Sequence, residues 1–171
     1  ATWAAQHRDR ARPLLWVHAP SVGEGLQAVA VLRRLRERHP GWQVVYTHFS
    51  PSAERLARSA PADIADYLPY DIPGAVDSLL DALAPTAIVF SKLDLWPELA
   101  TRADARGTAV GIIAATVSPV SGRTRWPARA LTRPGYGVVR AAGAISAEDA
   151  RRLARLGVHP DRIEVLGDPR F

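Results

Sequence analysis

Short apolar runs alternate with segments of helical periodicity along almost the whole chain, and this alternation constrains the fold more than any other feature. Several of the runs are apolar at every position, which is typical of strands buried on both faces. The expected strands are residues 14–19, 43–48, 64–68, 86–91, 108–115, 138–146 and 162–166. The alternation therefore predicts an α/β fold, a Rossmann-like, doubly wound parallel sheet covered by helices.

The segments between the strands carry start and stop signals for helices. Helical periodicity begins at Gly23 and ends before Pro40. A second helix is expected after Ser50, because proline at position 51 suits a first helical turn. Asp94 is expected to cap a helix that runs to about Arg106, and residues 118–133 read as a basic segment interrupted by proline.

The composition is that of an ordinary globular domain. The chain has 171 residues, of which 47% are hydrophobic and 23% charged, so its length predicts a single domain with a real core. It contains no cysteine, and its five histidines lack the spacing of metal ligands. We therefore expect neither a metal nor a cofactor.

The charge balance suggests an anionic partner. The net charge is +5 and the pI about 10.4, which fits nucleic acid or an acidic membrane surface. Lys92 is the single lysine, however, and the other cations are arginines in an alanine-rich chain, so we expect no nucleic-acid partner. Arg123, Arg125, Arg129 and Arg133 recur on one segment that could face an anionic membrane or the phosphates of a substrate, or could form a solvated basic face.

The carboxyl ends of parallel strands form the usual ligand-binding edge of such sheets. Polar or small residues follow the first, second, fourth and fifth expected strands at that edge. The candidate substrate-binding residues are Ser21, Val22, Gly23, Gly25, Ser50, Ser52, Lys92, Asp94, Thr116 and Ser118.

Glu24 is the one carboxylate expected in the first turn of the helix that follows the first strand. The structural interpretation is a capping box, because Ser21 stands three residues before it. The functional interpretation is a catalytic carboxylate at a helix N-terminus, flanked by Gly23 and Gly25, which leave the backbone open to a bulky ligand. The local pattern alone favours the capping box, and the glycine spacing is not the dinucleotide fingerprint.

Four motifs in order carry a resemblance to a known family. They are HAPSVGEG (18–25), YLPYDIPGAV (67–76), LDLWPEL (93–99) and VLGDPRF (165–171). Together they resemble the N-terminal domain of 3-deoxy-D-manno-octulosonic acid (Kdo) transferases, and the likeness extends over nearly the whole chain from about Leu14.

The resemblance implies an enzyme of lipopolysaccharide biosynthesis with two domains of the GT-B glycosyltransferase fold. Residues 1–171 would be the acceptor-side domain, and a donor-binding domain would lie outside this chain, so the fragment alone is expected to be inactive. The donor would be CMP-Kdo and the acceptor a lipid A precursor. The family pattern makes Glu24 the general base, and the enzyme would be cytoplasmic, peripheral at the inner face of the cell membrane.

The chain also departs from the family pattern. SPSA (50–53) stands where a TPTG-like turn is usual. In SKLDLWP (91–97), Lys92 and Asp94 replace glutamates, and in AATVS (114–118), Ala114 and Thr116 replace an asparagine and an arginine. Two alternatives therefore stay open: a divergent, non-catalytic binding domain, or another GT-B-like sugar-nucleotide enzyme such as a UDP-sugar epimerase.

Overall fold

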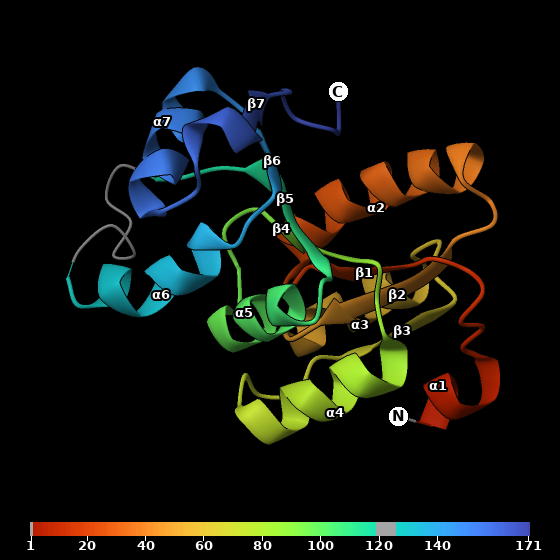
Figure 1. Ribbon diagram of the computed structural model, residues 1–171. Helices are drawn as coiled ribbons and strands as arrows, with labels where there is room; N and C mark the ends of the chain where they lie inside the picture. The colour runs from red at the N-terminus through yellow and green to blue at the C-terminus, as the bar shows by residue number, and fades with distance from the viewer. Residues whose placement is uncertain (1, 119–125) are drawn as a thin grey trace.

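A single seven-stranded sheet forms the centre of the molecule (Figure 1). The computed structural model describes residues 2–118 and 126–171. Neighbouring strands all pair in parallel, in the order β3-β2-β1-β4-β5-β6-β7. The strands are β1 (Leu14–His18), β2 (Gln43–His48), β3 (Ile64–Tyr67), β4 (Ala87–Ser91), β5 (Ala109–Ala115), β6 (Ala141–Ala144) and β7 (Ile163–Val165). The predicted Rossmann-like parallel sheet is confirmed.

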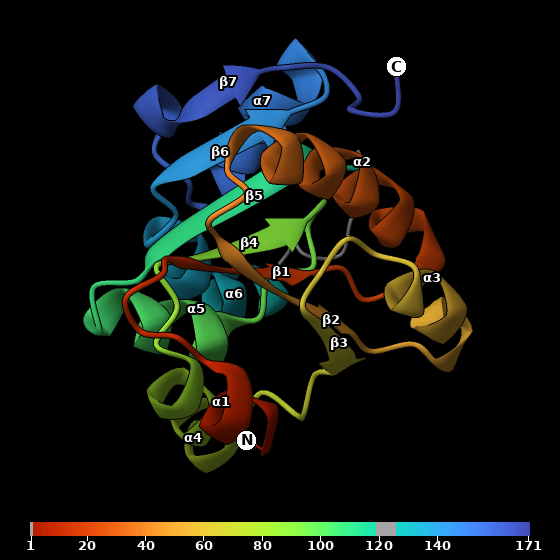
Figure 2. The same cartoon turned by 90° about the vertical axis from the view of Figure 1, so that its right-hand side faces the viewer.

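Helices cover both faces of this sheet (Figure 2). They are α1 (Thr2–His7), α2 (Val22–Arg38), α3 (Glu54–Arg58), α4 (Pro73–Leu83), α5 (Pro97–Ala105), α6 (Ala128–Gly137) and α7 (Ala147–Leu156). Two short 3-10 turns, η1 (Pro51–Ala53) and η3 (Pro160–Arg162), precede α3 and β7. Helices α2 and α3 lie on one face, and the other five belong to the opposite layer.

The two-residue period of β1 divides the core into two clusters. Leu14 and Trp16 point into the larger cluster, with residues of α1, α4, α5, α6 and α7. Leu15 and Val17 point the other way and pack against α2 and α3. Because successive side chains of a strand face opposite sides of the sheet, an apolar run at this position is buried along its whole length.

Helix α5 begins later than expected, and Asp94 is not its N-cap. The N-cap position belongs to Trp96, with Pro97 in the first turn. The carboxylate of Asp71 instead accepts hydrogen bonds from the backbone N–H groups of Glu98 and Leu99, each at 2.9 Å. The cap thus comes from the loop before α4, a tertiary contact that the local pattern around Asp94 does not reveal.

Residues 126–146 differ most from the expectation. Helix α6 occupies part of the expected basic segment, and the following strand is only β6, not residues 138–146. Gly135 explains why α6 packs closely on α5, since a Cβ there would come within 2.5 Å of Leu95 Cδ2 and 3.1 Å of Pro97 Cα. Of the four arginines singled out, Arg123 and Arg125 lie outside the described residues.

Within the described ranges, 2–118 and 126–171, no helix has both the length and the apolar character needed to cross a membrane. The same part of the chain holds no group of three or more histidine, aspartate or glutamate side chains placed to bind a metal ion.

The backbone conformation of Ala84, between α4 and β4, leads to a prediction about stability. It caps α4 in the left-handed conformation, with φ of +41°, where a Cβ is unfavourable and glycine is usual. Ala84→Gly should raise the free energy of unfolding by about 0.5–1 kcal/mol, the relief of strain less the added entropy of the unfolded chain.

The measurement is urea unfolding of the 171-residue chain. Ala82→Gly is the matched control, because Ala82 lies inside α4, where the same change should lower the free energy of unfolding by about 1 kcal/mol. A loss of stability in both variants would contradict the strain at Ala84.

Candidate functional site

The turn after β1 places Glu24 at the carboxyl edge of the sheet. Strand β1 ends at His18, and α2 begins at Val22 after the N-cap residue Ser21. Strand β1 lies between β2 and β4, so the loop after β4 is the direct neighbour of this turn. Glu24 stands in the first turn of α2, where the unpaired N–H groups and the helix dipole favour negative charge.

Four residues form what we call the Glu24 cluster: Ser21, Glu24, Ser91 and Lys92. The Nζ of Lys92 lies 3.0 Å from Oε1 of Glu24. The hydroxyl of Ser21 donates to Oε2 of the same carboxylate, and the hydroxyl of Ser91 donates to the Glu24 carbonyl at 2.9 Å. The carboxylate is therefore held at both oxygens, and its side chain is only 14% exposed.

The Ser21 hydroxyl does not cap the helix. It makes no hydrogen bond to a backbone N–H group of α2 and contacts the Glu24 side chain instead. The capping box that the local sequence pattern favours is therefore wrong, because the Ser21 hydroxyl does not accept the backbone hydrogen bond that such a box requires. The hydroxyl donates to the carboxylate, so the two side chains form one polar group at the carboxyl edge of the sheet.

The two glycines beside Glu24 have different surroundings. A Cβ on Gly23 would lie 3.3 Å from the Lys92 Nζ, so glycine here allows the ammonium to approach the helix. A Cβ on Gly25 would lie 2.6 Å from Leu56 Cδ2 and 2.8 Å from the Tyr46 hydroxyl. Gly25 is buried, so the expectation that it leaves the backbone open to a ligand is wrong. Its place is in the packing of α2 against Leu56 and β2.

Tyr46 brings a buried phenol close to the cluster. Among the described residues its hydroxyl has no hydrogen-bond partner. Burial raises the pKa of Tyr46 to about 12, and the negative charge of Glu24 acts in the same direction. The phenol is therefore neutral at physiological pH.

His18, at the end of β1, is a buried neutral histidine. Its Nδ1 lies 3.0 Å from the Thr47 hydroxyl, which also accepts a 2.8 Å hydrogen bond from the Trp16 indole. Burial lowers the pKa of His18 to about 4, although the Asp94 carboxylate opposes the shift. Its Nε2 is buried and has no hydrogen-bond partner in the part of the chain described.

Aromatic rings continue from His18 across the strand ends to the surface. The Trp96 ring lies 5.3 Å from His18 and 5.2 Å from Phe49, and Phe49 lies 6.0 Å from Tyr70. Trp96 therefore packs between the loops, whereas Tyr70 is 73% exposed. A hollow of about 400 Å³, lined by residues that include Tyr70, Asp71, Trp96 and Thr132, opens beside this row.

The remaining candidates follow the strand ends, where Val22 is the first residue of α2 and Ser52 lies in η1. The hydroxyls of Ser50 and Ser52 are 2.8 Å apart on an exposed turn. Thr116 is exposed, and its hydroxyl donates to the Ala114 carbonyl at 3.3 Å. Ser118 is exposed, Val22 is 39% exposed, and Asp94 is partly buried with its charge acting on His18.

The structure thus joins Ser21, Gly23, Glu24 and Lys92 in direct proximity. Ser91 and Tyr46 are neighbours of this cluster that sequence reasoning missed, as it missed the capping of α5 by Asp71. Ser91 had one available signal, its position as the last residue of a strand at the ligand-binding edge. The contacts of Tyr46 and Asp71 depend on packing between distant segments, and no local pattern signals them.

Two backbone positions beside the cluster adopt the left-handed region. Lys92 has φ of +57° and Ala114 has φ of +51°. The Lys92 N–H donates to the Ile113 carbonyl at 2.8 Å, so the two positions face each other across the ends of β4 and β5. Asparagine tolerates this conformation better than alanine does. The left-handed backbone at position 114 therefore explains why the family pattern has an asparagine there.

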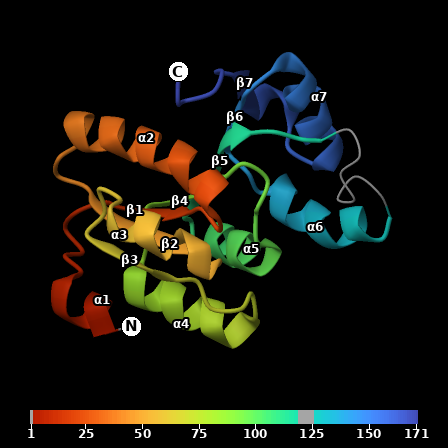
Figure 3. The same cartoon turned by 180° about the vertical axis from the view of Figure 1, so that it is seen from behind.

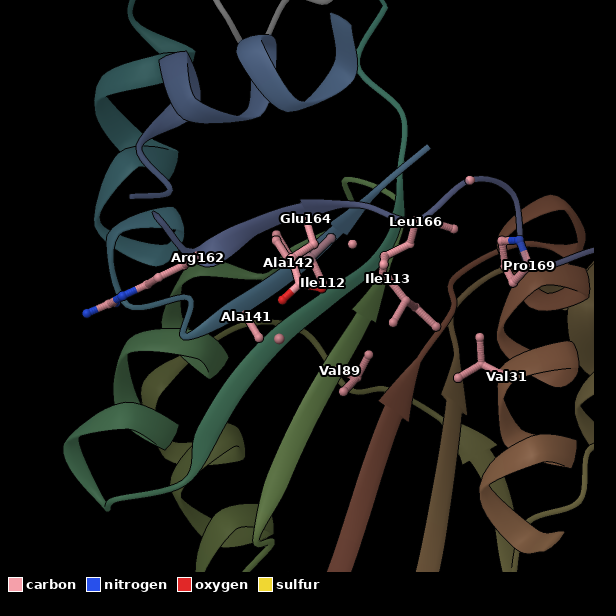
Figure 4. A pocket seen from close by; sticks show the side chains of 14 residues that line it. Val31, Val89, Ile112, Ile113, Ala141, Ala142, Arg162, Glu164, Leu166 and Pro169 are labelled. Atoms are coloured by element: carbon pink, nitrogen blue, oxygen red, sulfur yellow. The ribbon is translucent and has the colours of Figure 1, made fainter. Parts of the chain in front are cut away.

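A separate apolar groove of about 330 Å³ lies on the face of β4–β7 next to α2 (Figure 4). Its walls include Val31, Val89, Ile113, Leu166 and Pro169. Arg162 and Glu164 are the charged residues of its lining, and the groove includes none of the candidate site residues. It is distinct from the Glu24 cluster.

The parallel sheet, its strand order and the helices on both faces define a Rossmann-like α/β domain with a carboxylate at its carboxyl edge. The family model of 3-deoxy-D-manno-octulosonic-acid transferase (kdotransferase) matches residues 2–171, and the chain belongs to this family.

Curated relatives carry the same name. The chain is 33% identical over 153 residues to the 3-deoxy-D-manno-octulosonic acid transferase of Bordetella pertussis, covering 85% of this chain and 35% of that protein. It is 23% identical over 159 residues to the Haemophilus influenzae enzyme, covering 92% of this chain and 37% of the relative. A probable mitochondrial transferase of Arabidopsis thaliana is 32% identical over 125 residues, 70% of this chain and 28% of its own length. The chain therefore spans between 28% and 37% of the length of these relatives.

Solved structures share the fold. UDP-GlcNAc 2-epimerase from Neisseria meningitidis, bound to UDP-GlcNAc, superposes with a TM-score of 0.66 at 15% identity, covering 92% of this chain and 47% of the epimerase. UDP-GlcNAc 2-epimerase from Methanocaldococcus jannaschii gives a TM-score of 0.65 at 14% identity, over 91% of this chain and 45% of the other. At such identities the likeness concerns the fold alone.

His18 makes the stability of this domain depend on pH. Its pKa is about 4 in the folded chain against an ordinary value of 6.5, so the unfolded chain binds the proton more tightly. The contribution to stability is complete above about pH 6.5 and is lost as the pH falls towards about 4. Between pH 7.5 and 5 the wild type should lose about 2 kcal/mol of unfolding free energy through this group.

Urea unfolding at both pH values measures the loss, and His18→Gln should remove most of it. The matched control is His159→Gln, because the His159 side chain is 62% exposed. An unchanged pH dependence in His18→Gln would show that His18 is protonated as readily in the fold as outside it.

Proposed function

We propose that the chain is the acceptor-side domain of a glycosyltransferase that transfers Kdo from CMP-Kdo to a lipid A precursor in lipopolysaccharide biosynthesis. Membership of the kdotransferase family supports the reaction class. The single observation that carries the local assignment is the position of Glu24, a partly buried carboxylate in the first turn of α2 at the ligand-binding edge.

A positioned carboxylate supplies what glycosyl transfer to a hydroxyl needs. The acceptor oxygen attacks the anomeric carbon of the donor, the bond from that carbon to the phosphate oxygen breaks, and the attacking hydroxyl loses its proton. In the proposal, Glu24 takes that proton as the general base, which contributes roughly 100- to 10,000-fold to the rate. The nucleotide leaves with its phosphate, and the donor is held mainly by a second domain outside this chain.

Glu24→Gln in the full-length protein tests this role. The amide keeps the size of the side chain but cannot accept the proton, so turnover should fall by roughly two to four orders of magnitude. Release of CMP from CMP-Kdo in the presence of acceptor is the readout. The melting temperature should stay close to that of the wild type.

Glu37→Gln is the matched control, because Glu37 lies on the same helix with its side chain 62% exposed. Near-normal turnover of Glu24→Gln would remove the carboxylate from the mechanism. A wild-type protein that binds the donor without turnover would favour the divergent, non-catalytic domain, and epimerisation of a UDP-sugar would favour the epimerase alternative that the shared fold raises.

A finer part of the proposal concerns location: the enzyme would work as a peripheral protein at the cytoplasmic face of the inner membrane. Helix α6 and the turn before it support this, because Trp126 in the turn and Leu131 in the helix are 85% and 72% exposed, and Arg129 and Arg133 of α6 are exposed too. Large apolar side chains next to arginines suit the interface of an anionic membrane. Thr132 of the same helix lines the hollow at Trp96, close to the strand ends.

Replacing Arg129 and Arg133 with glutamine should weaken binding to vesicles rich in anionic lipid. Each arginine contributes about 1 kcal/mol near such a surface, so the pair should change the partition coefficient by roughly 30-fold. Vesicle sedimentation of the full-length protein at low salt is the measurement.

Arg151→Gln with Arg155→Gln on α7 removes the same charge elsewhere and should have a smaller effect. Equal losses in the two double variants would mean that net charge, and not α6, determines the binding.

A further inference from the structure

The Lys92 ammonium lies against the proposed general base. It is 3.0 Å from the Glu24 carboxylate, and the Lys92 side chain is 31% exposed, so solvent and solutes can reach it. The lysine also adopts a left-handed backbone conformation, with φ of +57°. Non-glycine residues are uncommon in that region and are often found at functional sites.

A purely structural role explains this arrangement poorly. A partly exposed ion pair usually adds little to stability, while the backbone conformation of Lys92 is itself unfavourable. Gly23 leaves room for the ammonium, because a Cβ there would lie 3.3 Å from Nζ, and the Lys92 side chain stays 31% exposed. A lysine side chain that stays accessible in this way is better placed to bind a solute than to stabilise the fold by packing.

The ammonium can serve two acceptors at once. It carries three N–H donors, and Glu24 is its ion-pair partner within the described residues. The second Glu24 oxygen is occupied by the Ser21 hydroxyl, so the carboxylate is fixed in place from both sides. The remaining N–H groups of Lys92 can donate to an anionic oxygen on the side of the ammonium that faces away from the carboxylate.

We propose that Lys92 is a positioning and specificity-determining residue that bridges Glu24 to an anionic oxygen group of the substrate. The group is a carboxylate of the sugar acid or a phosphate of the acceptor, which offer the same chemistry to an ammonium. This inference rests on the proposed function. It is particular to this chain, because the resembled pattern has a glutamate at position 92 and would place two carboxylates where this chain has an ion pair.

The test compares Lys92→Gln, Lys92→Arg and wild type in the full-length protein. For Lys92→Gln we expect KM to rise about tenfold or more for the substrate whose anion is bound, and kcat to fall because Glu24 loses one of its two restraints. Lys92→Arg keeps the charge and should restore that KM to within about threefold of wild type. A rise in the acceptor KM places the anion on the acceptor, and a rise in the donor KM places it on the donor, where binding of free Kdo separates the sugar carboxylate from the nucleotide phosphate.

Arg140→Gln is the matched control, because it breaks the 2.9 Å Arg140–Asp104 ion pair near the amino end of β6, outside the Glu24 cluster. Neither its KM values nor its kcat should change. If Lys92→Gln alters neither KM, or if Lys92→Arg fails to restore the affected one, the bridging role is wrong.

Binding measured without turnover separates this inference from the proposed function. Saturation-transfer NMR with free Kdo and, separately, with glucosamine 1-phosphate should show binding to wild type and Lys92→Arg of at least one probe that Lys92→Gln loses. A protein that binds a probe through Lys92 but transfers no sugar leaves the inference standing and refutes the proposed activity. Equal binding of both probes by all three proteins refutes the inference alone.

Discussion

The pairing of β1 with both β2 and β4 is the constraint on which the site depends. Because β1 lies between these strands, the turn that starts α2 and the loop after β4 meet at one edge of the sheet. Ser91 and Glu24 are 67 positions apart in the sequence, yet the serine hydroxyl donates to the glutamate carbonyl. The same adjacency brings the one lysine of the chain onto the one carboxylate of that helical turn. A reversal of strand order at this point is where open α/β sheets usually bind ligands.

Both faces of the sheet contribute to holding this edge in place. On one side, Gly25 lets the first turn of α2, which carries Glu24, lie close to Leu56 and the Tyr46 hydroxyl. On the other side, Trp96 packs between His18 and Phe49, and the Asp71 carboxylate caps α5. Helices α6 and α7 lie together at the end of the sheet away from α1 (Figure 3). The polar cluster therefore rests on packed elements on both faces.

The sequence predicted the sheet well, because buried strands and amphipathic helices differ in period, and runs such as residues 14–17 and 109–115 carry no polar side chain. It failed where tertiary contacts decide. Asp94 stands before a helix like a cap, but Asp71 supplies the carboxylate. Ser21 and Glu24 have the spacing of a capping box, but the hydroxyl donates to the Glu24 carboxylate, which also forms an ion pair with Lys92. Helix α6 was missed because prolines interrupt its pattern, although Gly135 and Tyr136 anchor it to α5 and the core.

The departures from the family pattern can be explained together as a change in the charge of the site. A glutamate at position 92 beside Glu24 would put two negative groups in a partly buried cluster, and like charges at such distances repel strongly. The family pattern has an arginine at position 116, whereas Thr116 in this chain is exposed and its hydroxyl donates to the Ala114 carbonyl. With lysine at 92, the cluster reaches neutrality through its own pair. A neutral cluster repels an incoming anion less than two carboxylates would, and the positive member of the pair is the more exposed one. The substitution is therefore compatible with a working site that receives an anionic substrate, and it does not by itself indicate decay.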